Sequence, residues 1–189
     1  MSLTNPLGDV PLTDPQAMRA LAHPVRLAIL SFLQRSGPAT ATTLAPQVNA
    51  TPSVVSWHLR HLAGFGLVTD ADPADAPGDR RQRWWVAVGK GFRIEATDDP
   101  AAQLLADQMY EAGLAQVSSW MTDVRPTLPP EWLRTAGLSN TRVALTADEL
   151  AALDEAIDQL LAPYVHRETP PDGARPVRIL RHFMPLEES

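Results

Sequence analysis

Short hydroxyl side chains, an aromatic ring and one arginine recur at helical spacing within Thr51–Val68, which reads TPSVVSWHLRHLAGFGLV. A helix turns about 100° per residue, so side chains three and four positions apart share a face. The residues gathered on this face are Ser53, Ser56, Trp57 and Arg60, with Val54 and His61 on one flank. The face holds no acid, whereas a solvated helix face usually pairs Lys with Glu. Hydroxyl and guanidinium groups suit base edges and phosphates, so the pattern favours nucleic-acid contact over an ordinary surface helix.

This helix is predicted to have Thr51 as its N-cap and Pro52 as its first residue, and to end near Gly64 and Gly66. On the face opposite the polar one, three apolar side chains stack and predict the contact with the core: Val55, Leu59 and Leu62.

A second short helix is predicted at 40–47, capped by Thr40, and Val48, Asn49 and Ala50 form a tight connection to Thr51. Two short helices joined in this way predict a helix-turn-helix. Downstream, 67–70 and 83–88 alternate like strands around the loop 71–82, which is rich in Pro, Asp and Gly, so a β-hairpin wing is expected.

The chain resembles the winged helix-turn-helix repressors of the ArsR type. The matching residues, in the family's order, are Val55-Ser56, His58-Leu59, Arg60 and Gly66-Leu67-Val68, and 21–30 (LAHPVRLAIL) is similar to the family's opening helices. The resemblance implies a dimeric DNA-binding transcriptional regulator, usually a repressor. It also implies that the helix following the wing carries the dimer contact.

Three arginines within four residues of the predicted wing are interpreted as phosphate clamps, although they would also offset the aspartates of the same loop. With the cap residues and the helix face, the predicted DNA contacts are Thr40, Thr51, Ser53, Val54, Ser56, Trp57, Arg60, His61, Arg80, Arg81 and Arg83. Of Trp84 and Trp85, which alternate along the strand, one is expected in the core.

Composition limits the other possibilities. The 189 residues are 44% hydrophobic and contain no cysteine, which excludes disulfides, thiolate metal sites and a cysteine nucleophile. We find no signal peptide and no apolar run long enough for a membrane span, so a cytoplasmic location without membrane contact is expected. Phosphate-binding loops and nucleophile elbows are absent, so we expect no enzyme activity and no cofactor.

Charge divides the chain into two regions. Residues 1–96 hold nine Lys and Arg against seven Asp and Glu, whereas 97–189 hold seven against fifteen, although the net charge is −6. The acidic part should face away from DNA. The predicted organisation is a mobile arm (1–14), a winged helix-turn-helix domain (15–96) and a C-terminal dimerisation and effector region (97–189).

The N-terminal part of the domain is expected to contain two helices. Asp14 and Pro15 open a helix that ends near Leu21, and a second helix follows from 25 to 35. His23, just before a proline, is interpreted as a capping or packing residue rather than a ligand. His58 and His61 are spaced for a metal but lack a third ligand nearby, so no metal site is predicted.

The C-terminal region is predicted to start with a long helix at 101–121, whose apolar residues form two seams. One seam, with small neighbours, is assigned to a homodimer interface, with an intramolecular core helix as the alternative: Leu105, Met109, Ala112, Gly113 and Trp120. A strand, helix, strand unit should follow at 141–145, 146–164 and 176–184. The fold class is therefore mostly α with small β.

Aromatic and methionine side chains near the Pro-rich connector predict a pocket for a small apolar effector, unless they only fill the core: Tyr110, Trp120, Met121 and Trp132. The function expected from all these features is sequence-specific binding of a homodimer to an inverted repeat in double-stranded DNA. A winged-helix adaptor that binds proteins without reading DNA is the alternative.

Overall fold

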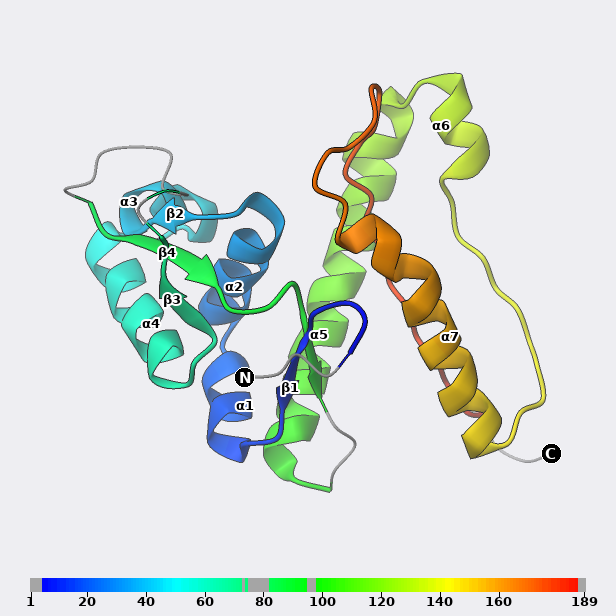
Figure 1. Ribbon diagram of the computed structural model, residues 1–189, viewed down its shortest axis with the longest axis horizontal. Coiled ribbons are helices and arrows are strands. Elements are labelled where there is room, and N and C mark those ends of the chain that lie inside the picture. Colours follow the sequence, from blue (N-terminus) through cyan, green and yellow to red (C-terminus); the bar gives the residue numbers. More distant parts are fainter. Residues whose placement is uncertain (1–4, 73, 75–81, 95–97, 187–189) are drawn as a thin grey trace.

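The computed structural model describes residues 5–72, 74, 82–94 and 98–186, and its fold is mostly helical with two small sheets, as predicted (Figure 1). The N-terminal half contains, in chain order, β1 (Val10–Leu12), α1 (Pro15–Leu21), α2 (Pro24–Ser36), β2 (Ala39–Thr40), α3 (Ala41–Leu44), a 3-10 helix (Ala45–Val48), α4 (Pro52–Gly64), β3 (Val68–Asp70), β4 (Trp84–Ala87) and β5 (Phe92–Ile94). The C-terminal half contains α5 (Pro100–Ser119), a π-helical turn (Trp120–Val124), a 3-10 helix (Arg125–Thr127), α6 (Pro130–Thr135) and α7 (Ala147–Val165).

Capping residues followed by proline fix where the helices begin. Asp14 accepts a hydrogen bond from the Gln16 amide at 2.8 Å and starts α1, and Asp99 starts α5 in the same way. His23 caps α2 through Nδ1, which accepts from the Val25 amide at 3.2 Å. Each cap satisfies an amide that the helix leaves unpaired, and proline at the first position loses no hydrogen bond.

The predicted hairpin is confirmed as β3 and β4, which pair antiparallel with Asp70 opposite Trp85. Strand β2 pairs with the other edge of β4, so β4 is the middle strand of a three-stranded sheet. Trp85 is buried beneath this sheet, in agreement with the prediction that one of the two tryptophans belongs to the core.

The prediction of a mobile arm over 1–14 is wrong for the described part of that segment. Val10–Leu12 pairs in parallel with Phe92–Ile94, and Val10 and Leu12 are buried. An Asx-type turn precedes the strand, since the Asn5 side-chain oxygen accepts hydrogen bonds from the Leu7 and Asp9 amides.

The hydrophobic core lies between α1, α2, α4 and the three-stranded sheet, and the first two turns of α5 complete it. Leu105 is 0% exposed and packs with Ala101 and Ala102 in the same cluster as the residues of α1. The domain boundary predicted at residue 96 therefore cuts through the core. The boundary was predicted from composition and charge, which do not show that the first turns of α5 pack into this core.

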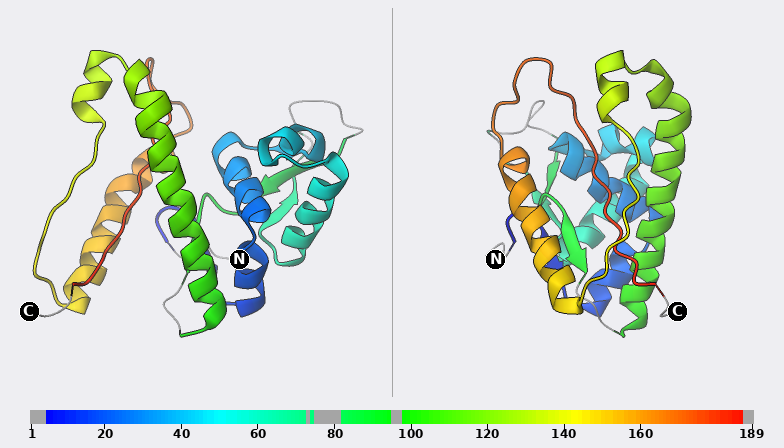
Figure 2. Two further views of the ribbon diagram at one scale, coloured as in Figure 1. Left: turned by 180° about the vertical axis from the view of Figure 1, so that it is seen from behind. Right: turned by 90° about the vertical axis from the view of Figure 1, so that its right-hand side faces the viewer.

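The described elements from β1 to β5 are called the winged unit below. Beyond its first turns, α5 extends away from this unit towards α6 (Figure 2). No helix among the described residues is long and apolar enough to cross a membrane. The expected strands at 141–145 and 176–184 are absent: both segments are extended but unpaired, and 176–184 passes between α5 and α7. Alternation predicted strands there, but no described sheet edge lies beside either segment for it to join.

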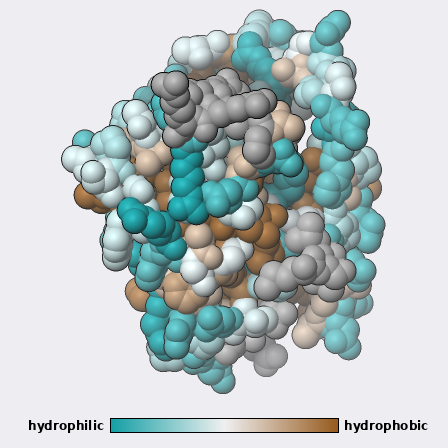
Figure 3. Space-filling view, turned by 60° about the vertical axis from the view of Figure 1, so that its left-hand side comes forward, coloured by the Kyte–Doolittle hydropathy of each residue, from teal (hydrophilic) through white to brown (hydrophobic). Residues whose placement is uncertain are grey.

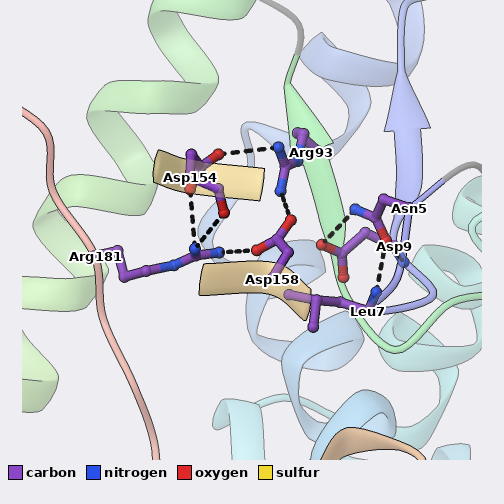
Figure 4. Close-up of polar contacts among 7 residues, drawn as sticks. All are labelled: Asn5, Leu7, Asp9, Arg93, Asp154, Asp158 and Arg181. Atoms are coloured by element: carbon purple, nitrogen blue, oxygen red, sulfur yellow. Dashed lines mark hydrogen bonds and ion pairs between the residues drawn. The ribbon is translucent and has the colours of Figure 1, made fainter. Parts of the chain in front are cut away.

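Helix α7 is attached to the winged unit by a cluster that we call the Arg–Asp clasp, which consists of Arg93, Asp154, Asp158 and Arg181 (Figure 4). Arg93 of β5 donates to Asp154 at 3.1 Å and also to Asp158. Arg181 of the C-terminal segment donates to Asp154 at 2.9 Å and to Asp158. Asp158 is only 2% exposed, so its charge depends on these two guanidinium groups.

Candidate nucleic-acid interface

Helices α3 and α4 form the predicted helix-turn-helix. The connection between them turns at Asn49, which adopts a left-handed conformation with φ 49°, and the Ala50 amide donates to the Ala45 carbonyl at 3.0 Å. Asparagine tolerates this conformation better than most residues. Thr51 then caps α4 by accepting from the Val54 amide at 3.4 Å.

The two faces of α4 differ as predicted. Val55, Leu59 and Leu62 are fully buried against the core. The opposite side is accessible to a partner along its length, and its exposed or half-buried residues are Thr51, Ser53, Val54, Ser56, Trp57, Arg60 and His61.

Arg60 and Ser56 lie together on the accessible face. The Arg60 Nε donates to the Ser56 carbonyl at 3.1 Å, and its Nη2 donates to the Ser56 hydroxyl at 3.2 Å. Because a guanidinium has five N–H donors, most of them stay available for an acceptor outside the protein.

Thr40 does not belong to this surface. It is buried, its hydroxyl accepts from the Thr43 amide at 3.1 Å, and it also contacts the Thr43 hydroxyl. The prediction that Thr40 contacts DNA is therefore wrong, because the side chain that caps α3 points into the fold.

His58 serves the interior of the domain. It is 6% exposed, its ring lies 5.0 Å from the ring of His23, and its Nδ1 has no hydrogen-bond partner among the described residues. Burial lowers the pKa of His58, and the neighbouring His23, Arg26 and His61 lower it further. The pKa of His23 is also lowered, mainly by burial and then by Arg26. In the described part of the chain, no group of three or more His, Cys, Asp or Glu residues is arranged to hold a metal ion.

In the hairpin, Arg83 is engaged within its own chain. It donates to the two Asp70 carboxylate oxygens at 2.6 and 3.1 Å, and its guanidinium lies 3.9 Å from the Trp85 ring centroid. This pairing lowers the pKa of Asp70 and raises that of Arg83. The other two predicted clamps, Arg80 and Arg81, lie outside the described residues.

Of the two apolar seams predicted on α5, the more exposed one is not the seam that was assigned to the dimer. In the seam assigned to the dimer, Leu105 and Gly113 are buried and Ala112 is partly buried against the core of their own chain, while Met109 is exposed and Trp120 is half-buried. Leu105 and Gly113 therefore cannot meet a partner. The other seam, which with Val124 we call the α5 stripe, is half-buried at Val117 and otherwise exposed: Tyr110, Leu114, Val117, Met121 and Val124.

Two of the four residues predicted to line an effector pocket, Tyr110 and Trp132, contact residues near the C-terminus. The ring of Tyr110 meets that of His182 edge-on at 5.8 Å, and Arg175 lies 5.7 Å from the centroid of Trp132. Met121 is exposed and Trp120 is half-buried. A shallow depression beside the start of α5, lined by Asp98, Asp99, Pro100, Gln103, Leu104 and Asp107, contains none of these residues.

Residues 21–71 match a family described as a helix-turn-helix domain. This chain contains a helix-turn-helix domain. The matched range includes α2, α3, α4 and β3 but not the rest of the hairpin or the C-terminal half. The match supports a place among helix-turn-helix transcription regulators, which bind DNA and are generally not enzymes. A comparison with curated proteins gave no match.

Proposed function

We propose that this protein is a sequence-specific transcriptional regulator of the ArsR-like winged type that acts as a homodimer on an inverted-repeat operator, most simply as a repressor. The proposal rests on the accessible face of α4, which presents hydroxyls, an aromatic ring and an arginine without an acid. In helix-turn-helix domains the second helix enters the major groove, where such groups meet base edges.

The homodimer is supported by the α5 stripe. Leu114 is 52% exposed, and Tyr110, Met121 and Val124 are exposed next to it, so the stripe presents apolar side chains along several turns of one helix. A contiguous exposed apolar patch of this kind marks an interaction surface. A second copy is the partner that also supplies the second recognition helix needed for an inverted repeat.

Selection of bound duplexes from a random pool tests the function. We expect an enriched inverted repeat whose half-sites lie about one helical turn apart. Arg60→Ala and Ser56→Ala should relax the preference at particular positions, with a loss of about 1–3 kcal/mol for a good bidentate contact. Arg134→Ala, an exposed arginine on α6, is the control and should leave the preference unchanged. If all variants select the parent's sequence, another element reads the bases.

A protein-binding adaptor is the second candidate, and the net charge of −6 favours it because phosphate repels an acidic protein. Recovery of no enriched sequence from the pool, at low as well as physiological salt, would support the adaptor.

We also propose that any effector is a small apolar molecule and not a metal ion, since the chain lacks cysteine and the region 101–121 lacks histidine. At Tyr110 and Trp132 such a ligand would compete with His182 and Arg175. Tryptophan fluorescence with apolar metabolites, alongside titration of zinc, cadmium and nickel into the DNA complex, distinguishes the two classes.

A further inference from the structure

Two apolar side chains lie exposed in the first half of the recognition helix. Val54 is 45% exposed and Trp57 is 55% exposed, and they are three positions apart, so they are neighbours on one face of α4. Figure 3 shows apolar surface interrupting the hydrophilic surface on one side of the molecule. In a helix-turn-helix domain, the N-terminal residues of the second helix are those that contact base edges.

The ring of Trp57 is held in place before any partner binds. It stacks on the ring of His61 with an interplanar angle of 13° and centroids 5.5 Å apart. The buried ring of His58 meets it edge-on at 4.9 Å with an angle of 74°. A side chain fixed on two sides loses little conformational entropy when it docks, so it can discriminate between small groups.

The polar groups of α4 lie beside this pair and do not cover it. Arg60 is folded back onto Ser56 by two hydrogen bonds, and α4 contains no acid that would compete for it. Val54 offers only methyl groups, and Trp57 offers an apolar ring with a single N–H donor. Their natural counterpart in the major groove is the C5-methyl group of thymine, the apolar group that base pairs present there.

We propose that Val54 and Trp57 read thymine methyl groups in each half-site. This inference rests on the proposed DNA-binding function and specifies which base feature the helix recognises. Contact with the methyl is worth about as much as one buried methylene, about 0.8 kcal/mol, which corresponds to a change of about four-fold in affinity.

Replacement of thymine by uracil tests the proposal, because it removes only the methyl group and keeps base pairing. On a selected operator, uracil at the contacted positions should weaken the parent protein about four-fold per methyl. Trp57→Ala and Val54→Ser, which remove the apolar ring and both methyl groups, should bind the thymine and uracil operators more nearly alike, each at the positions that its own side chain contacts. Trp57→Phe, which keeps an apolar ring, should retain most of the discrimination.

Leu160→Ala, which truncates a more exposed apolar residue on α7, is the control and should discriminate as the parent does. The proposal is overturned if uracil has no effect on the parent, or if uracil weakens the parent and the Trp57 and Val54 variants equally. Failure to select any operator would instead count against the DNA-binding function, so the two failures are distinguishable. Circular dichroism verifies that the helix content of each variant equals that of the parent.

Discussion

His58 lies on α4 directly after Trp57, yet it is buried and its ring contacts that of His23 at the start of α2. Its Nδ1 has no hydrogen-bond partner among the described residues, and Arg26 and His61 add positive charge nearby. This environment stabilises the neutral imidazole because a buried cation beside other cations is costly. The buried side of α4, which supports the proposed DNA-binding face, therefore contains a group that is sensitive to acid.

The domain should lose stability below pH 6.5, the ordinary pKa of histidine. The pKa values of His23 and His58 are lowered by folding, so between 6.5 and the lower folded values the unfolded chain binds more protons. Their contribution is thus fully present above pH 6.5 and is lost as the pH falls through the folded pKa values. Urea unfolding at a series of pH values measures this slope, and His58→Gln, which cannot take up a proton, should flatten it. An equal slope in the variant would mean that other groups cause the acid sensitivity.

At the residue scale, the sequence revealed side-chain chemistry better than side-chain direction. The caps at Asp14, Thr51 and Asp99 were predictable, because each of these residues stands before a proline at the start of an apolar period. Thr40 was predicted to contact DNA, but its side chain is buried and its hydroxyl contacts Thr43 instead. Burial of a single hydroxyl depends on the tertiary fold, so local pattern cannot show it.

The wing is the element in which charge dominates. Arg83 is already paired with Asp70, so the predicted phosphate contacts of the hairpin fall on Arg80 and Arg81, which lie outside the described residues. In the proposed complex these two arginines contact phosphates and release counterions.

Replacing Arg80 and Arg81 with Ala should therefore reduce the dependence of DNA affinity on salt. Each lost phosphate contact lowers the logarithmic slope by about 0.9, and the sequence preference should not change. Affinity measured over a range of salt concentrations gives the slope. A matched pair of exposed arginines in the C-terminal half, Arg125 and Arg134, is the control and should leave the slope unchanged. An unaltered slope in the Arg80 and Arg81 variant would remove the wing from the contact.

The α5 stripe allows the proposed dimer to be tested by disulfide cross-linking. Because the chain contains no cysteine, any disulfide must come from the introduced thiols. Single substitutions Tyr110→Cys, Leu114→Cys and Met121→Cys place one thiol each along the stripe. If two stripes face each other, at least one position lies near the two-fold axis and forms an intermolecular disulfide under mild oxidation, visible on a non-reducing gel. Leu160→Cys, more exposed but on α7, should not form one. Equal linkage at all four positions would indicate random collision and not a dimer.

Strands were predicted correctly where the pairing strand is close in sequence, and were missed where the pairing strand is remote. The hairpin of β3 and β4 follows from two alternating segments around one loop. Strand β1 was missed because its partner β5 lies some 80 residues further along the chain, and nothing in Val10–Leu12 indicates that pairing. The segment 176–184 has the alternation of a strand, but a strand also needs a neighbouring edge, and the described sheets offer none there.

At the scale of the whole molecule, the contacts between the halves of the described chain include the first turns of α5, the Arg–Asp clasp, and a hydrogen bond of 2.7 Å between His166 Nε2 and the Pro6 carbonyl. The first turns of α5 belong to the same hydrophobic core as the helix-turn-helix, so this helix moves with that domain. Helix α7 is held differently: Leu153, Leu160 and Tyr164 are exposed, and the Arg–Asp clasp joins it to β5 and to the C-terminal segment. The contacts that hold α7 to the N-terminal half are therefore largely polar, and four charged groups form the clasp.

Asp158→Asn should release α7 from the winged unit without unfolding that unit. The substitution removes the most buried charge of the clasp and leaves Arg93 and Arg181 facing an amide. The loss should be smaller than the 3–5 kcal/mol typical of a fully buried pair, because the Arg93 side chain is 41% exposed. Hydrogen exchange should accelerate in α7 while the amides of α4 keep their protection. Asp148→Asn, an exposed acid in the first turn of α7 outside the clasp, is the matched control and should leave exchange in the second half of α7 unchanged. Equal acceleration in α4 would mean that the clasp supports the entire fold, and no acceleration in α7 would mean that apolar contacts hold the helix.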